Sequence, residues 1–344
     1  MKIFVTGTEG YIGVLLAQKL MARGHEVVGL DTGYYRDGWL YSSSTDFPLL
    51  PCLVNKDLRR IEERDLEGFD AVIHLAELSN DPLSENNPEV TFKINHQGSV
   101  ELAKKAKRQG VERFIYTSSC SVYGFSENDF VTEDSPTNPQ TPYAVCKTLV
   151  ERDVGALADE SFSPVFLRNA TAYGPSPRMR FDIVLNNLAG WARTTRKIAM
   201  TSDGSPWRPV VHVLDICKAI ICALEAPRES VHRQIFNVGN NEDNHQVKDL
   251  AGIIGEIFTN CEVTMGSSIG DNRSYRVSFD KINSLLPGFS CDWNARAGAE
   301  NLYDIFERIQ LDDALFRFRA YTRLMQLKYL QATGQIDGDF FWRY

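Results

Sequence analysis

The segment VTGTEGYIG, residues 5–13, limits most narrowly the fold that this chain can adopt. It places glycines at positions 7, 10 and 13 between a strand-like run, KIFVTG, and a helical pattern near 11–23. Gly7 permits a tight turn, Gly10 lets backbone amides approach a phosphate, and Gly13 lets the helix pack close to the strand. This order predicts a parallel sheet whose first helix presents its N-terminus to a negatively charged ligand.

Short apolar runs and helical patterns continue to alternate through the first half of the chain. The runs include EVVGLD, AVIHLA, RFIYTSS and SPVFLRN, and a helical pattern lies near 88–109. The alternation is typical of an α/β fold, a Rossmann-type doubly wound parallel sheet with right-handed crossovers. We expect an NAD-binding domain at 1–170 and a smaller C-terminal substrate-binding domain at 171–344, with about 208–240 returning to the first sheet. Residues 301–344 predict one or two amphipathic helices, which we expect to pack on the substrate-binding domain.

The second strand, EVVGLD, ends at Asp31. A carboxylate at this place can accept hydrogen bonds from both hydroxyls of an adenosine ribose, and it repels a 2′-phosphate. The sequence therefore predicts NAD rather than NADP as the cofactor. Arg36 is the nearby group that could weaken this preference.

Composition restricts the partners. The chain has 37 Lys and Arg against 45 Asp and Glu, a formal charge of −8, and no basic stretch interleaved with aromatic residues, which argues against nucleic acid and acidic membranes. Seven scattered cysteines show no spacing suited to zinc, so we expect reduced thiols and no metal. No apolar run approaches a membrane span, and the first strand leaves no room for a signal peptide; we expect a cytoplasmic protein.

The segment TPYAVCK, residues 141–147, places Tyr143 one helical turn before Lys147 if a helix begins at Pro142. Tyrosine ordinarily ionises at about pH 10, and both the Lys147 ammonium and a positively charged nicotinamide ring should lower its pKa. Tyr143 is therefore a candidate general base. The same spacing also arises on ordinary surface helices, so the neighbouring motifs must show whether Tyr143 and Lys147 are catalytic.

Further motifs follow in an order that resembles the extended short-chain dehydrogenase/reductase family, in its NAD-dependent nucleotide-sugar epimerase/dehydratase branch. They are Asp57-Leu58, HLA at 74–76, Asn95, SSCSVYG at 118–124, RNATAYGP at 168–175 and DGSPWRPVVHVLDI at 203–216. The resemblance covers about residues 1–240 and is more specific for the family than for the reaction.

The resemblance implies roles for the matching positions. The catalytic residues would be Ser119, Tyr143 and Lys147. The cofactor would be bound by Gly7, Gly10, Tyr11, Ile12, Gly13, Asp31, Asp57, Leu58, Leu75, Ala76, Asn95, Tyr143 and Lys147. The substrate, a nucleotide-diphosphate sugar, would meet Ser79, Ser119, Cys120, Ser121, Asn169, Arg178, Arg180, Asn187, Arg208 and Arg273. Guanidinium groups suit this substrate because they pair bidentately with phosphate.

Two positions narrow the expected chemistry. Sugar dehydratases of this family carry an Asp-Glu pair where this chain has Cys120 and Ser121, and decarboxylating relatives keep a glutamate at the position of Ser121. We therefore expect an NAD-dependent nucleotide-sugar epimerase that acts at C4 through a transient 4-keto intermediate. A nucleotide-sugar 4-ketoreductase or dehydrogenase is the alternative, and a non-catalytic dinucleotide sensor is a third hypothesis.

The resemblance also implies a homodimer. Its interface would pair the helix after Asn95 and the helix that contains Tyr143 with their symmetry mates. Apolar residues at helical spacing fit this arrangement and equally fit core packing; they are Val100, Leu102, Val145, Leu149 and Val150.

Overall fold

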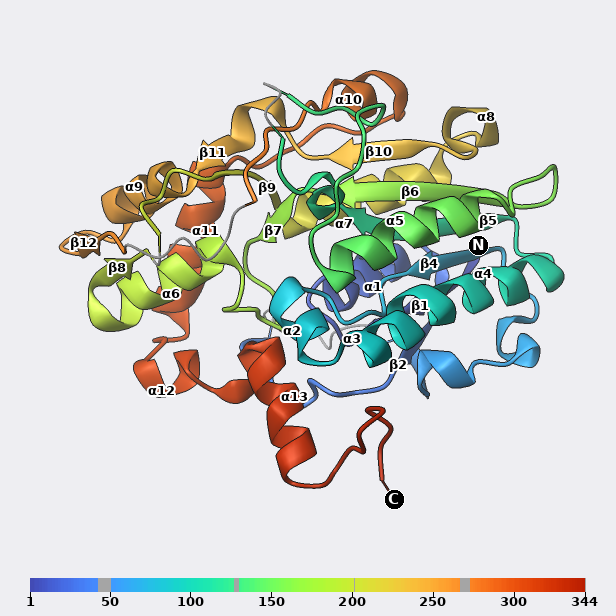
Figure 1. The fold of residues 1–344 in the computed structure, drawn as a ribbon, viewed down its shortest axis with the longest axis horizontal. Coiled ribbons are helices and arrows are strands. Elements are labelled where there is room, and N and C mark those ends of the chain that lie inside the picture. The colour runs from blue at the N-terminus through green and yellow to red at the C-terminus, as the bar shows by residue number, and fades with distance from the viewer. Residues whose placement is uncertain (43–50, 127–129, 201, 267–272, 344) are drawn as a thin grey trace.

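The computed structural model describes residues 1–42, 51–126, 130–200, 202–266 and 273–343 (Figure 1). Within them, seven strands form one parallel sheet in the order β10-β6-β5-β4-β1-β2-β3. The strands are β1 (Lys2–Thr6), β2 (Glu26–Asp31), β3 (Cys52–Asn55), β4 (Ala71–His74), β5 (Arg113–Ser119), β6 (Ser163–Asn169) and β10 (Ile235–Val238). The strand order reverses between β1 and β4, which confirms the predicted doubly wound sheet.

Helices cover both faces of this sheet (Figure 1). On one face, α1 (Gly13–Ala22) and α7 (Val213–Glu225) bury Leu16 and Ile220 against Val5 of β1. On the other, α4 (Ser99–Arg108) and α5 (Pro142–Gly155) pack near Phe4. Successive side chains of a strand point to opposite faces, and both faces of β1 are covered, which explains its continuous apolar run.

The remaining elements of the first half form a helical run between β4 and β5. Its members are α2 (Asp81–Asn86), α3 (Pro88–Thr91), a π-helix (Phe92–Gly98) and α4. The pattern predicted near 88–109 is therefore helical throughout, with a π-helical segment that contains Asn95. Short 3-10 helices occur at Leu58–Arg60, Glu63–Leu66 and Cys120–Tyr123.

Beyond β6 the chain builds two small sheets and several helices. The sheets have the orders β11-β9-β7 and β12-β8. Their strands are β7 (Thr171–Tyr173), β8 (Lys197–Ala199), β9 (Trp207–His212), β11 (Asn244–Gln246) and β12 (Glu262–Thr264). The helices are α6 (Val184–Thr195), α8 (Arg228–Val231), α9 (Val247–Ile257), α10 (Asp280–Leu285), α11 (Ala295–Arg308), α12 (Asp313–Phe316) and α13 (Arg323–Ala332), and 3-10 turns lie at Asn241–Asp243 and Arg319–Tyr321.

The predicted return of about 208–240 to the main sheet is partly right. Strand β10 pairs with β6, and α7 covers the sheet. Strand β9 instead pairs with β7 and β11, because the chain leaves the main sheet after Asn169.

The C-terminal residues divide between two apolar clusters. Phe316 and Tyr321 pack among side chains of α6, α9 and α11, as predicted for residues 301–344. From α13 onward the prediction is wrong, because Leu327, Leu330 and Phe340 pack against residues of the N-terminal half. These are Tyr34, Leu78, Leu83, Val90 and Ile94. Figure 1 shows α13 beside α2.

The residues proposed for a dimer interface also divide. Leu102 and Val150 are fully buried in the core between α4, α5 and the sheet. Val145 and Leu149 are partly exposed and belong to none of the core clusters formed by the described residues. Val100 is partly exposed too, although it packs against the core cluster of α4 and α5, so Val100, Val145 and Leu149 are available to a partner.

In the part of the chain that the structure describes, no helix combines the length and the apolar character needed to cross a bilayer.

Candidate active site

A cavity of about 740 Å³ lies at the carboxyl ends of the central strands. Gly7 follows β1, Asp31 ends β2, Ser119 ends β5 and Asn169 ends β6, and all four line it. The opposite wall comes from the C-terminal half and includes Asn187 of α6. A cavity at the point where the strand order reverses is the usual ligand site of such sheets.

The glycine turn has the geometry that its sequence predicts. Gly7 has φ +77°, and a Cβ there would lie 2.9 Å from the backbone nitrogen of Ala76. A Cβ on Gly13 would lie 2.0 Å from the Gly7 carbonyl oxygen, so only glycine permits this close packing. No side chain caps the N-terminus of α1, and its first turn contains no acidic residue. The amides of Val14 and Leu15 already donate to the Gly10 and Ile12 carbonyls, so a dinucleotide diphosphate would meet the amides at the start of this turn and the positive end of the helix dipole.

The Asp31 carboxylate lies at the cavity wall and accepts hydrogen bonds from the backbone amides of Glu9 (3.0 Å) and Gly33 (2.8 Å). Burial raises its pKa, and the neighbouring Glu9 carboxylate raises it further. Arg36 forms an ion pair with Glu9 at 2.6 Å and also donates to Asn55. Because Glu9 holds Arg36, two carboxylates stand where a 2′-phosphate would have to bind, and the residues fit NAD.

Tyr143, Lys147 and Ser119 meet in this cavity. Helix α5 begins at Pro142, as predicted, and the Thr141 hydroxyl caps it by accepting from the amide of Ala144 at 3.2 Å. The Lys147 ammonium lies 5.3 Å from the centre of the Tyr143 ring. A hydrogen bond joins the Ser119 hydroxyl and the Tyr143 phenol.

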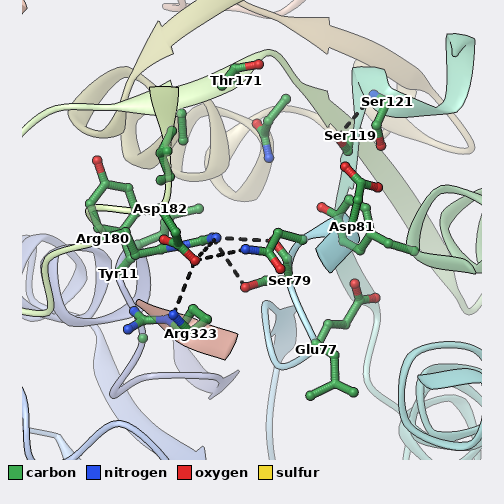
Figure 2. Close-up of a pocket in the computed structure, with 18 of the residues that line it drawn as sticks. Tyr11, Glu77, Ser79, Asp81, Ser119, Ser121, Thr171, Arg180, Asp182 and Arg323 are labelled. Carbon is green, nitrogen blue, oxygen red and sulfur yellow. Dashed lines mark hydrogen bonds and ion pairs between the residues drawn. The ribbon is translucent and has the colours of Figure 1, made fainter. Parts of the chain in front are cut away.

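Glu77 is a site residue that the sequence analysis missed. Its carboxylate lies 2.6 Å from the Lys147 ammonium and accepts a hydrogen bond of 2.6 Å from the Tyr116 hydroxyl. Both members of the ion pair are buried, with side chains 5% and 2% exposed. The sequence did contain a sign of this role. Glu77 directly follows the strand-end motif HLA, and a side chain at that position opens into the cavity (Figure 2).

These charges act on Tyr143 in opposite directions. Burial raises the pKa of Tyr143, Lys147 and Ser119 lower it, and Glu77 and Asp81 raise it. The contribution of Lys147 has the predicted sign, but burial outweighs it, so the net direction of the Tyr143 pKa in the protein is upward. Burial alone would lower the pKa of Lys147, but Glu77 and Tyr143 raise it. The lysine therefore stays charged.

Most of the predicted substrate residues line the cavity. They are Ser79, Ser119, Ser121, Asn169, Arg180, Asn187, Arg208 and Arg273. The Ser121 hydroxyl and the Asn169 carbonyl oxygen are buried without a hydrogen-bond partner among the described residues. A polar ligand in the cavity would satisfy them.

Three of the predicted residues do not line the cavity. Asn95 holds the loop after β4 through two hydrogen bonds with the Leu78 backbone. The buried Cys120 thiol donates to the Arg168 carbonyl at 3.1 Å. Arg178 donates to the carbonyls of Tyr35, Arg36 and Gly38, and so holds the backbone that follows β2.

The predicted cofactor residues other than Asn95 all line the cavity. Tyr11 and Ile12 lie in the glycine turn, Asp57 and Leu58 follow β3, and Leu75 and Ala76 follow β4. Asp57 also caps a 3-10 helix by accepting from the Arg59 amide at 2.8 Å.

A polar cluster closes one side of the cavity (Figure 2). The Asp182 carboxylate accepts from the Arg180 guanidinium at 2.9 and 3.1 Å, from the Asn80 amide at 2.8 Å and from the backbone amide of Arg323. Arg180 also donates to Ser79 at 3.3 Å. Asp182 and Arg323 had no signal in the sequence, because neither belongs to a motif.

Comparison with known proteins agrees with this geometry. The family model described as "NAD dependent epimerase/dehydratase family" matches residues 3–239. The UDP-glucose 4-epimerase of Mycolicibacterium smegmatis is 32% identical over 303 residues, which are 83% of this chain and 92% of that protein. The human UDP-glucose 4-epimerase is 29% identical over 269 residues, 69% of this chain and 77% of that protein.

Solved structures extend the comparison to the fold. MoeE5 in complex with UDP-glucose and NAD is 26% identical with a TM-score of 0.76, and the match covers 90% of this chain and 99% of that one. The Thermotoga maritima UDP-glucose 4-epimerase with UDP-glucose has a TM-score of 0.77 at 24% identity, with 90% of this chain and all (100%) of that one covered. About a tenth of this chain thus lies outside these matches. The chain belongs to the NAD-dependent epimerase/dehydratase family.

Proposed function

We propose that this chain is an NAD-dependent nucleotide-sugar epimerase that inverts C4 of the sugar through a transient 4-keto intermediate. The observation that carries the proposal is the meeting of Tyr143, Lys147 and Ser119 in one cavity with the glycine turn. The UDP-glucose 4-epimerases among the relatives support a UDP-hexose as the first substrate to test.

Each catalytic side chain has a distinct task in this reaction. Bound NAD supplies the hydride acceptor and donor. Tyr143 removes the proton from the C4 hydroxyl and returns it once the ketone is reduced on its other face. Lys147 holds a positive charge that lowers the pKa of Tyr143, and Ser119 donates to the phenol and keeps the reacting oxygen within reach.

The second half of the chain supplies groups for the nucleotide sugar. Arg208 lies in β9 and donates to the Trp207 carbonyl at 2.8 Å, and it also donates to the Arg273 carbonyl, so the two arginines are neighbours at the cavity wall. Guanidinium groups in this position suit a nucleoside diphosphate. The unpartnered Ser121 hydroxyl lies just after β5, and the unpartnered side-chain carbonyl oxygen of Asn169 lies at the end of β6, where the sugar would reach Tyr143.

Dehydration is disfavoured by the same residues. It requires a free acid and base beside the sugar, yet Cys120 is buried away from the cavity and donates to Arg168. Of the nearby carboxylates, Glu77 is paired with Lys147, and Asp81 accepts from Thr141 and is paired with Arg273. A 4-ketoreductase would use the same Tyr143 and Lys147. The two activities differ in the cofactor: an epimerase turns over with the NAD that it keeps bound, whereas a reductase exchanges its cofactor after each reaction.

We further assign residues 1–170 to cofactor binding and infer a homodimer through α4 and α5, with Val145 and Leu149 toward the partner. All seven cysteines are free thiols, which supports the cytoplasmic location that the sequence predicts.

The test is incubation of the purified protein with UDP-glucose, UDP-galactose, UDP-glucuronic acid and their GDP and dTDP counterparts, without added cofactor. An epimerase interconverts the C4 isomers without consuming NADH. In D₂O the product should carry no deuterium at C4, because the abstracted hydride returns to the same carbon. Deuterium incorporation beside a carbonyl would indicate inversion through an enol, and turnover that occurs only with added NADH and consumes it would indicate a reductase; either result would replace the proposal.

A further inference from the structure

We propose that the C-terminal segment, residues 319–343, is part of the cofactor site, and that Arg323 and Arg180 together bind the diphosphate of the dinucleotide. They would act from the side opposite to the N-terminus of α1. The inference takes the NAD cofactor from the proposed function, and it adds a binding element that the family match, which ends at residue 239, does not contain.

The argument begins with the burial of Arg323. Its side chain lines the cavity although the residue is only 3% exposed. The guanidinium donates to the carbonyls of Ala320 (3.2 Å) and Arg178 (3.3 Å) and lies 4.1 Å from the centre of the Tyr35 ring. Within the described ranges, no carboxylate forms an ion pair with it. A buried guanidinium without a counter-ion is unfavourable unless a ligand supplies the negative charge.

The neighbouring carboxylates offset this charge only in part, because Asp182 and Asp31 act on Arg323 without forming an ion pair with its guanidinium among the described residues. Asp182, the carboxylate of the cluster, is already paired with Arg180 through two hydrogen bonds and accepts a third from Asn80. Burial, with help from the Arg180 charge, lowers the pKa of Arg323 to about 10. The Tyr35 hydroxyl, which also lines the cavity, is buried without a partner among the described residues. The cluster therefore presents an excess positive charge and an unused hydroxyl to the cavity.

The position of the cluster identifies the ligand. Arg323 stacks on Tyr35, in the segment that follows Asp31, and its charge interacts with Asp31 itself. Arg180 donates to Ser79, after β4, and its charge acts on Tyr11 of the glycine turn. Both arginines thus face the ends of the strands that hold the dinucleotide. Arg208 and Arg273 form a separate pair for the nucleotide sugar.

Hydrogen bonds hold the rest of the C-terminal segment at the same end of the cavity. The Trp342 indole donates to the Thr32 carbonyl at 2.6 Å, and the Tyr34 hydroxyl donates to the carbonyl of Phe340. Arg59, which is paired with Asp57 at 2.7 Å, donates to the Asp339 carbonyl at 2.8 Å. A bound dinucleotide and this segment should therefore stabilise each other.

The test uses the full-length protein freed of cofactor by charcoal and titrated by calorimetry with NAD, ADP-ribose, adenosine and UDP. We expect Arg323→Gln to weaken NAD and ADP-ribose by roughly 10- to 100-fold, the usual effect of losing a charged hydrogen bond, and to leave adenosine and UDP nearly unchanged. Arg317→Gln is the matched control, because it removes an exposed charge in the same stretch of chain and should change none of the four. Unchanged NAD and ADP-ribose binding, or a loss confined to UDP, would overturn the proposal.

A second measurement needs no variant. In hydrogen exchange on the unmodified protein, NAD and ADP-ribose should slow exchange of the amides in 323–343, and UDP should not. Equal exchange with and without NAD would also overturn the proposal. Neither experiment requires sugar turnover, so a protein that binds NAD through Arg323 but does not epimerise any sugar would refute the proposed function alone.

Discussion

The ammonium of Lys147 lies 2.6 Å from the carboxylate of Glu77, and both groups are buried beside the phenol of Tyr143. Tyr143 is therefore adjacent to a neutralised pair rather than to an isolated cation. The lysine favours the phenolate and the glutamate opposes it. This balance gives the site a resting state in which the tyrosine keeps its proton, and the positive charge of a nicotinamide ring would shift the balance toward the phenolate.

Tyr143→Phe should lower turnover by about 10²- to 10⁴-fold, because it removes the general base and leaves the shape of the side chain nearly unchanged. NAD content after purification and the melting temperature should not change. Steady-state kinetics with the best sugar nucleotide, together with cofactor extraction, checks both points. A phenylalanine variant with near-normal turnover would eliminate Tyr143 as the base.

Glu77→Gln should move the rise of activity with pH toward lower pH. The carboxylate raises the pKa of Tyr143, so its removal allows the phenolate to form in more acidic solution. Glu63→Gln, an exposed glutamate paired with Arg108 at the surface, is the matched control and should leave the profile in place. A profile of turnover against pH that stays unshifted in Glu77→Gln contradicts this role.

Lys147→Met should have two separable effects. The acidic limb of the activity profile should move to higher pH, because Lys147 lowers the pKa of Tyr143. The free energy of unfolding should fall by about 3–5 kcal/mol at neutral pH, since Glu77 is left buried without its partner.

The pH dependence of that loss of stability follows from the pKa of Glu77. Burial already raises this pKa, and loss of Lys147 raises it further. A group whose pKa is raised by folding adds stability below its unfolded pKa and removes it as pH rises through the folded pKa. The variant should therefore lose stability relative to the parent as pH increases, and adding Glu77→Gln should restore most of it. Thermal melts of Lys147→Met and of the double variant across pH measure these changes in stability. If Glu77→Gln does not restore the stability lost in Lys147→Met, the buried Glu77–Lys147 ion pair is not its cause.

NAD should bind at least roughly tenfold more tightly than NADP, because a 2′-phosphate beside Asp31 and Glu9 would be repelled by about 1–3 kcal/mol. Asp31→Asn should narrow the difference, and Arg36→Gln should widen it, since Glu9 then loses its counter-ion. Competition titrations with the two cofactors measure this directly. Equal affinities in the parent protein would show that another group overrides Asp31.

Leu149→Glu should convert the proposed homodimer to a monomer, because this partly exposed residue of α5 belongs to none of the apolar clusters of the described chain. Light scattering measures the mass of the parent and the variant. A monomeric parent protein would contradict the proposed homodimer.

The sequence predicts the features that are local or periodic. The glycine turn, Asp31 at a strand end and the helix that begins at Pro142 follow from residue types at fixed spacing, and the structure has all three. The resemblance implies that Cys120 contacts the substrate, but in the 3-10 turn its thiol donates to the Arg168 carbonyl.

Other features depend on contacts between residues far apart in the chain. The pairing of Glu77 with Lys147 joins the loop after β4 to the interior of α5, and Arg323 reaches the cavity because α13 packs on Leu78, Leu83 and Ile94. No spacing rule connects such positions, so amphipathic character alone could not decide which half of the molecule α13 covers.

The contact between Trp342 and Thr32 has a consequence for biosynthesis. A ribosome makes Thr32 long before Trp342, so the first strands emerge before the residues that cover them. Until residues 323–343 have been made and have folded, an apolar surface that includes Leu78, Leu83 and Ile94 stays open to chaperones or to other nascent chains. A chain that stops before α13 would keep that surface exposed.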